Sequence, residues 1–294
     1  MALFKGCGAA MVTPFGKDGQ IDYAVLEGYI EHLIDGGVSA LLPFGTTGEP
    51  PTVSPEEYKK ATEFIVSRAK GRVPVIVGAG SNSTSHAAEK AAAAKSYGAD
   101  GVLVVTPYYN KCTQKGLVEH YKAVVKAAGV PVLAYNVPAR TGVNIAPKTL
   151  VELKKAGVVG VKEASGDVDQ FHDVAKVCDD VGLDLYCGDD ILTTMAISLG
   201  SIGTISVAAN PAPKEISALC ALALGGKYEE ARALQFKLSE FIHALFIEVN
   251  PIPVKKAMQY IGIDVGIPRL PLTELEPEHA EILKSEMIKV GLIK

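Results

Sequence analysis

The chain has 294 residues, of which 48% are hydrophobic and 21% charged, with a formal net charge of -4 at pH 7. This composition excludes a disordered chain, and the slight acidic excess lacks the basic surplus of a nucleic-acid binder. Aromatic residues make up only 6% and tryptophan is absent. We therefore expect a core of Val, Ile, Leu and Ala, as in buried parallel strands covered by Ala-rich helices.

The five cysteines are scattered without a CxxC pair, which indicates reduced thiols in a cytoplasmic protein. The six histidines show no HxH or HExxH spacing, so we expect no metal site. No apolar stretch approaches the roughly 18 residues that suggest a membrane span, and the first residues lack the apolar core of a secretion signal. We expect a soluble cytoplasmic protein that acts on small molecules, with neither nucleic acid nor a membrane as partner.

Eight short apolar runs follow one another along the first 210 residues. They are rich in Val, Ile and Leu and apolar on both faces, which is typical of strands buried on both sides of a parallel sheet. The runs cover residues 8–13, 38–44, 73–78, 101–106, 130–135, 158–161, 183–186 and 202–207.

Segments with helical periodicity lie between these runs. Residues 23–34 carry apolar side chains at helical spacing. Ser54 and Pro55 open the next segment as an N-cap followed by proline at the first helical position. Residues 84–97 are Ala-rich, as in a helix packed closely on a sheet, and Gly129 is placed to end a later helix.

Strands that alternate with helices fit either an open doubly wound sheet or a closed barrel, and eight such units favour closure. After residue 210 only helical patterns remain, at 211–224, 227–249, 251–262 and 277–290. We predict an α/β chain with a (β/α)8 TIM barrel catalytic domain over residues 1–210. A C-terminal α-helical extension is predicted over residues 211–294, in place of the two domains that length alone suggests.

The active sites of such barrels lie at the C-terminal ends of the strands. Lys162 follows the apolar run 158–161. A lysine there commonly extends its amine to the rim, but a desolvated amine is also a competent Schiff-base nucleophile. Tyr135 ends the preceding strand, where its phenol could move protons to a carbonyl oxygen or simply close the barrel core.

Two further strand ends could bind carboxylates. The turn GTTG at 45–48 offers backbone amides and two hydroxyls. Arg140 offers a planar guanidinium, although exposed loop arginines are common without such a role. No Walker lysine follows the turn, and the glycines at 78–80 lack the third glycine of a dinucleotide motif, so nucleotide binding is disfavoured.

Seven motifs, in order along nearly the whole chain, resemble the 4-hydroxy-tetrahydrodipicolinate synthase (dihydrodipicolinate synthase) family of pyruvate-dependent class I aldolases. They are GTTGE (45–49), TPYYN (106–110), YNVPARTG (135–142), VKEASG (161–166), CGDD (187–190), ISVAAN (205–210) and NPIPVK (250–255). The resemblance implies a Schiff-base aldol condensation of pyruvate with L-aspartate 4-semialdehyde, giving 4-hydroxy-tetrahydrodipicolinate in lysine and diaminopimelate biosynthesis. It implies no metal or organic cofactor, because the imine itself is the electron sink.

The resemblance also implies the roles of the catalytic residues. Lys162 would form the Schiff base with pyruvate, and Tyr135 would donate and accept protons. Thr46 and Tyr109 would complete a proton relay to water, with the tyrosine supplied by a neighbouring subunit. The family is commonly a dimer of dimers, so a homotetramer is expected.

The same resemblance assigns the residues that would bind the substrates. Thr47 would hold the pyruvate carboxylate, and the main chain at Gly188 and Ile205 would line the imine pocket. Arg140 would bind the carboxylate of the semialdehyde.

Three alternatives stay open. N-acetylneuraminate lyase and the 2-keto-3-deoxy-sugar-acid aldolases would share Lys162 and Tyr135 but need a polyol pocket, whereas Arg140 favours the semialdehyde. A phosphate-binding barrel isomerase would leave Lys162 merely structural. A non-catalytic regulator would not need the whole set of site residues.

One departure from the family pattern concerns feedback inhibition by lysine. Asn82 and Tyr108 match the polar cluster of strongly inhibited members. Ser, His, His and Glu of that cluster are replaced here by Pro50, Pro55, Tyr58 and His86. The carboxylate missing at His86 would have paired with the ammonium of lysine, so we expect weak or absent inhibition.

Overall fold

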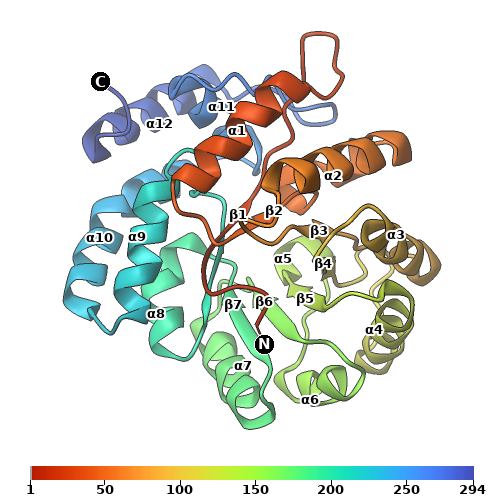
Figure 1. Ribbon diagram of the computed structural model, residues 1–294. Coiled ribbons are helices and arrows are strands. Elements are labelled where there is room, and N and C mark those ends of the chain that lie inside the picture. The colour runs from red at the N-terminus through yellow and green to blue at the C-terminus, as the bar shows by residue number, and fades with distance from the viewer. Residues whose placement is uncertain (1) are drawn as a thin grey trace.

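A computed structural model describes residues 2–294 and shows eight strands surrounded by helices (Figure 1). All neighbouring strands are parallel, in the order β2-β1-β8-β7-β6-β5-β4-β3. The two ends of this row meet where Leu41 pairs with Val75 and where Gly78 N–H donates to Pro43 O at 2.9 Å. The predicted (β/α)8 TIM barrel is confirmed.

Each predicted apolar run overlaps one strand, and most strands are shorter than the run. The strands are β1 Gly6–Ala10, β2 Ala40–Leu42, β3 Ile76–Gly78, β4 Gly101–Val105, β5 Val132–Asn136, β6 Gly160–Glu163, β7 Asp184–Cys187 and β8 Gly203–Ser206. The sixth strand continues beyond the predicted run. Lys162 therefore lies within the strand, next to its last residue.

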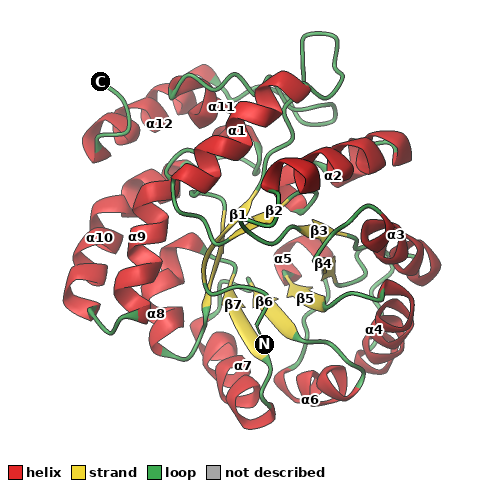
Figure 2. Ribbon diagram, viewed as in Figure 1, coloured by secondary structure: helices red, strands yellow, loops and turns green. Residues whose placement is uncertain are grey.

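Helices form the outer layer (Figure 2). They are α1 Tyr23–Asp35, α2 Pro55–Ala69, α3 Thr84–Ser96, α4 Gln114–Ala128, α5 Pro138–Thr141, α6 Pro147–Lys155, α7 Val168–Val181, α8 Thr193–Ser198, α9 Pro213–Leu224, α10 Tyr228–Ala244, α11 Ile252–Tyr260 and α12 Pro277–Val290. Helix α2 begins as predicted: Ser54 Oγ accepts from Glu57 N–H at 3.2 Å, and the Glu57 carboxylate accepts from Ser54 N–H at 2.9 Å.

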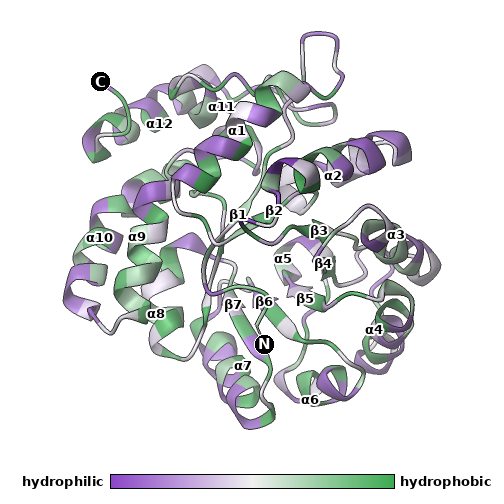
Figure 3. Ribbon diagram, viewed as in Figure 1, coloured by the Kyte–Doolittle hydropathy of each residue, from purple (hydrophilic) through white to green (hydrophobic). Residues whose placement is uncertain are grey.

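The strands separate two apolar layers because successive side chains point to opposite faces. In β5, Val132 and Ala134 belong to the large core between the strands and the helices, whereas Leu133 and Tyr135 belong to a smaller cluster inside the barrel. Figure 3 shows hydrophobic colour along the strands and mixed colours on the surrounding helices. A residue's place in this alternation therefore decides whether it faces the barrel interior.

The C-terminal helices continue from the barrel. Helix α9 packs on β1 and β8, as the eighth barrel helix does in this architecture, and α10 packs on α9 and α12. Helix α10 ends at Ala244 and not at residue 249 as predicted, because residues 245–251 turn back toward the strand ends. The division of the chain at residue 210 stays a prediction.

Candidate active site

A cavity of about 290 Å³ lies at the C-terminal ends of the strands. Seven of the eight predicted site residues line it: Thr46, Thr47, Tyr135, Arg140, Lys162, Gly188 and Ile205. They come from five strands or from the loops that directly follow them. The barrel thus brings together side chains that are spread over most of the sequence.

Lys162 and Tyr135 occupy paired positions of β6 and β5. Lys162 is only 5% exposed, and its Nζ lies 4.4 Å from the centroid of the Tyr135 ring. The ring face stabilises an ammonium through its quadrupole, while the cavity walls remove most of its water. A substrate carbonyl that enters this cavity meets an amine and a phenol together.

Gly188 leaves the space that the lysine side chain needs. A Cβ built at this position would lie 2.8 Å from Lys162 Cε and 2.5 Å from Ala164 Cβ, closer than carbon atoms approach in proteins. Any larger residue at position 188 would therefore push Lys162 out of place.

Two neighbouring aspartates after β7 have different surroundings. Asp190 is buried and accepts hydrogen bonds from the Ser206 hydroxyl and from Val207 N–H at 2.9 Å, so it holds the end of β8. Asp189 lines the cavity and accepts from Gly166 N–H at 3.2 Å. Burial raises the pKa of Asp189, and the nearby charge of Lys162 opposes that rise. Among the described residues that line the cavity, Asp189 alone is acidic.

The residues that follow Tyr135 and Lys162 point away from the cavity. Asn136 Nδ2 donates to the Glu163 carboxylate at 2.9 and 3.2 Å, and Asn136 Oδ1 accepts from Ile145 N–H at 2.9 Å. Burial raises the pKa of Glu163. These two side chains anchor the loops after β5 and β6, so their role is structural.

The threonine turn is a short 3₁₀ segment, Thr46–Gly48, tied down by a hydrogen bond from Thr13 Oγ1 to Gly48 O at 2.7 Å. Phe44 and Glu49, on either side of it, have positive φ angles of 58° and 55°. Side chains of this size rarely adopt that conformation, and such strain is typical of functional sites. Thr47 is 2% exposed.

Asn250 is a site residue that sequence reasoning did not assign. Its Nδ2 donates to Thr47 Oγ1 at 3.0 Å, and its backbone oxygen accepts from Arg140 Nη2 at 3.2 Å. Its place in the NPIPVK motif (250–255) was the available signal, but no spacing rule connects it to residues 47 and 140.

Tyr109 is the one predicted site residue outside the cavity. It is 91% exposed, with a φ of 73°. Its neighbour Tyr108 lines an apolar groove of about 360 Å³ that shares Thr46, Arg140 and Asn250 with the cavity. Within a single chain the tyrosine does not join the other site residues.

A buried ion pair beside the site was also missed. Lys255 Nζ lies 2.6 Å from Glu49 Oε1, and both side chains are almost fully buried. Glu49 Oε2 also accepts from Arg269 N–H at 2.9 Å. Burial lowers the pKa of Lys255 to about 8, and the charge of Glu49 opposes that shift. The pair joins the end of the threonine turn to α11.

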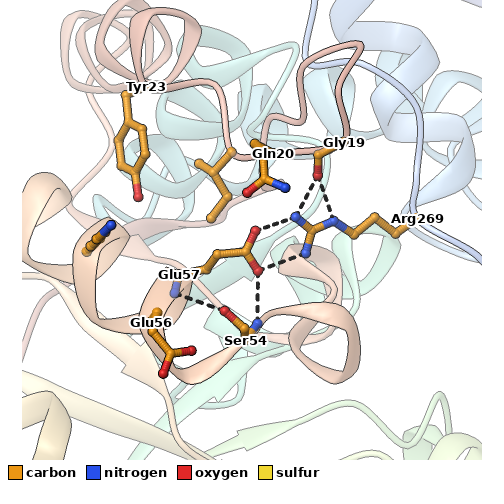
Figure 4. A pocket seen from close by; sticks show the side chains of 9 residues that line it. Gly19, Gln20, Tyr23, Ser54, Glu56, Glu57 and Arg269 are labelled. Atoms are coloured by element: carbon orange, nitrogen blue, oxygen red, sulfur yellow. Dashed lines mark hydrogen bonds and ion pairs between the residues drawn. The ribbon is translucent and has the colours of Figure 1, made fainter.

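A larger hollow of about 530 Å³ lies elsewhere, between α2, the loop before α1 and the C-terminal segment (Figure 4). Two of its charged side chains, Arg269 and Glu57, are paired with each other. Arg269 contacts both oxygens of the Glu57 carboxylate, and its Nε donates to Gly19 O at 3.1 Å. This arginine fastens the C-terminal segment to the barrel, and the hollow is not a candidate active site.

Three structural observations bear on other classes of function. All five cysteines are unbridged. Within residues 2–294, no group of three His, Cys, Asp or Glu side chains has the arrangement of a metal site. Across the same residues, no helix is both long and apolar enough to cross a membrane.

Comparison with known proteins gives consistent results over the full chain. The model of the dihydrodipicolinate synthetase family matches residues 3–289. Proteins named 4-hydroxy-tetrahydrodipicolinate synthase from Caldicellulosiruptor saccharolyticus and Clostridium novyi are 46% and 47% identical. The alignments cover 99% of both chains in the first case, and 98% of this chain and 97% of the relative in the second.

Solved structures agree with the sequence relatives. The dihydrodipicolinate synthase of Thermotoga maritima superposes with a TM-score of 0.96 at 40% identity, covering 99% of this chain and all of the other. The enzyme of Acinetobacter baumannii, solved in complex with pyruvate, superposes with a TM-score of 0.95 at 41% identity, covering 98% and 99%.

Proposed function

Because the chain belongs to the dihydrodipicolinate synthetase family, we propose that it condenses pyruvate with L-aspartate 4-semialdehyde through an imine on Lys162. It is a lyase of the class I aldolase type, and its product is 4-hydroxy-tetrahydrodipicolinate, in lysine and diaminopimelate biosynthesis. The observation that supports Lys162 best is its buried amine, 4.4 Å from the Tyr135 ring centroid in a cavity with groups for two carboxylates.

The first half of the reaction activates pyruvate. The neutral amine of Lys162 attacks the ketone carbon, and the carbonyl oxygen takes a proton from Tyr135. Loss of that oxygen as water leaves a protonated imine. Thr47 holds the carboxylate of pyruvate during these steps, while the main chain at Gly188 and Ile205 lines the imine pocket.

The second half forms the carbon–carbon bond. The imine withdraws electrons, so the methyl group of pyruvate loses a proton and an enamine forms. The enamine carbon attacks the aldehyde carbon of the semialdehyde, whose oxygen takes up a proton through Tyr135. The amino group of the bound semialdehyde then attacks the imine carbon, which closes the ring and frees Lys162.

These reaction steps require the carboxylates of the two substrates to be bound at separate places. The threonine turn and Arg140 lie on different loops but line the same cavity. Arg140 donates one N–H to the backbone oxygen of Asn250, and the rest of its guanidinium is left to bind the semialdehyde carboxylate. This pairing of anion groups favours the semialdehyde over a polyol substrate.

The proton relay would need a second subunit. We propose that Tyr109 of one chain reaches Thr46 of its neighbour, and that the protein is a homotetramer built as a dimer of dimers. The 91% exposure of Tyr109 and the apolar groove beside Thr46 and Arg140 support this arrangement. A biosynthetic enzyme of this kind would work in the cytoplasm.

Steady-state kinetics with both substrates tests the proposal. Lys162→Ala should abolish product formation, and Tyr135→Phe should lower kcat by about 10²- to 10⁴-fold because a positioned acid–base group is lost. Lys155→Ala, which removes an exposed lysine of α6, is the matched control. Wild-type turnover by Lys162→Ala would overturn the proposal.

A further inference from the structure

Asn250 contacts both residues to which the proposed function gives a substrate carboxylate. It is 5% exposed and lies in the segment that follows α10. Its side chain reaches Thr47 and its backbone oxygen reaches Arg140, at 3.0 and 3.2 Å.

The direction of the contact with Thr47 decides what the hydroxyl can do. A threonine hydroxyl has one proton to donate and lone pairs that accept. The Nδ2 group of Asn250 can only donate, so Thr47 Oγ1 is the acceptor in this bond. The hydroxyl proton is then free to point into the cavity, where a carboxylate would accept it.

We propose that Asn250 is a positioning residue that directs the Thr47 hydroxyl proton toward the carboxylate of pyruvate. The inference rests on the proposed function, because it assumes that pyruvate binds beside Thr47. Without the amide, the buried hydroxyl would be free to turn its proton to a backbone oxygen. The binding of pyruvate would then lose a donor that is already aligned.

The second contact of Asn250 extends this role to the other substrate. Arg140 is exposed on the short helix α5, and the bond to the Asn250 carbonyl is the one hydrogen bond of its guanidinium within residues 2–294. A displaced Asn250 would therefore release the guanidinium as well. Because the side chain touches Thr47 and only the main chain touches Arg140, substitution should affect pyruvate more than the semialdehyde.

A double-mutant cycle tests the inference. Asn250→Ala and Thr47→Val should each raise the KM for pyruvate by about 10-fold, the scale of one hydrogen bond to a charged group. In the Thr47→Val background, Asn250→Ala should add little, because no hydroxyl is left to orient. The kcat at saturating substrates should change less than the KM. Asn250→Asp keeps the size of the side chain but replaces the donor with an acceptor, so it should raise the KM at least as much as Asn250→Ala.

Controls separate positioning from folding. Asn144→Ala removes an asparagine that is hydrogen-bonded outside the cavity and should leave the KM for pyruvate unchanged. If Asn250→Ala does not fold, Asn250→Ser takes its place in the cycle, because serine is too short to reach Thr47.

Three outcomes would overturn the inference. The role of Asn250 would be overturned, with the proposed function left standing, by either of two results. One is that the increases in KM for pyruvate add fully in the double variant, and the other is an unchanged KM in folded Asn250→Ala. Failure of wild-type protein to form a borohydride-stable adduct with pyruvate on Lys162 would overturn it together with the proposed function.

Discussion

At the scale of single residues, the alternation of side chains along a strand places the proposed catalytic residues on one face and structural residues on the other. In β5 and β6, Tyr135 and Lys162 face the cavity, while Asn136 and Glu163 hydrogen-bond to each other outside it. A shift of either strand by one residue would exchange these roles. The acid next to Lys162 is therefore a loop anchor and not a general base.

Arg140→Ala tests the assignment of the second carboxylate site. The KM for the semialdehyde should rise about 10- to 100-fold, since charge-assisted hydrogen bonds to a carboxylate are lost. Imine formation with pyruvate should stay intact, because the role proposed for Arg140 concerns only the second substrate. Arg68→Ala, at a half-buried position of α2 outside the cavity, is the control. Unchanged semialdehyde kinetics in Arg140→Ala would remove this substrate assignment.

At the scale of elements, the site depends on contacts between the barrel loops and the C-terminal segment. The Glu49–Lys255 pair joins the threonine turn to α11, and both residues are buried. The cost of removing the two charges from water largely cancels their attraction. The pair therefore matters most when one partner is missing.

Lys255→Met should lower the free energy of unfolding by about 3–5 kcal/mol, because Glu49 would keep a buried charge without a partner. Replacing both residues, with Glu49→Gln and Lys255→Met, should recover most of that loss. Denaturant titrations at one protein concentration measure both effects. A double variant that is no more stable than Lys255→Met would contradict this account.

The lowered pKa of Lys255 also predicts a pH dependence. Its pKa falls from 10.5 to about 8 on folding, so between these values the unfolded chain binds more protons than the folded one. Stability contributed by Lys255 should therefore rise with pH in this window. Wild type should therefore gain stability relative to the Glu49→Gln, Lys255→Met double variant as the pH rises from 8 to 10.5. A loss of stability of wild type relative to the variant over this range would contradict the expected pH dependence.

Feedback inhibition by lysine also depends on how elements pack, because the substituted positions meet between α2 and α3. Pro50, Pro55, Tyr58 and His86 line one cavity of about 420 Å³ together with Lys90. Glu89 lines the same cavity, and its charge and that of Lys90 offset each other, so the lining offers no net negative charge to the ammonium of lysine. We expect lysine titration to give weak or no inhibition. Complete inhibition at sub-millimolar lysine would contradict this expectation.

At the scale of the whole molecule, the barrel could be predicted because strands buried on both faces are continuous apolar runs. The site was predictable as far as strand ends identify it, and Lys162, Tyr135 and Gly188 meet there. The part that could not be predicted depends on long-range contacts. Asn250 lies 203 residues from Thr47 along the chain, and no local pattern signals that they touch.

The placement of Tyr109 predicts that the assembly completes the site. The Lys162→Ala and Tyr109→Ala variants should each have low activity when assayed alone. Co-expressed, the two variants should form hybrid dimers in which one site has both Lys162 and a neighbour's Tyr109. Activity well above that of either variant is the expected result. Activity equal to the average of the two would show that Tyr109 does not act across subunits.

Lys162 is proposed to carry the substrate as an imine. The most direct measurement is to incubate the protein with pyruvate, reduce with borohydride and locate the adduct by peptide mass spectrometry. We expect one stable adduct per chain, on Lys162, and none on the Lys162→Ala variant. A protein that forms no adduct, or forms it equally well after Lys162→Ala, would contradict the role of Lys162.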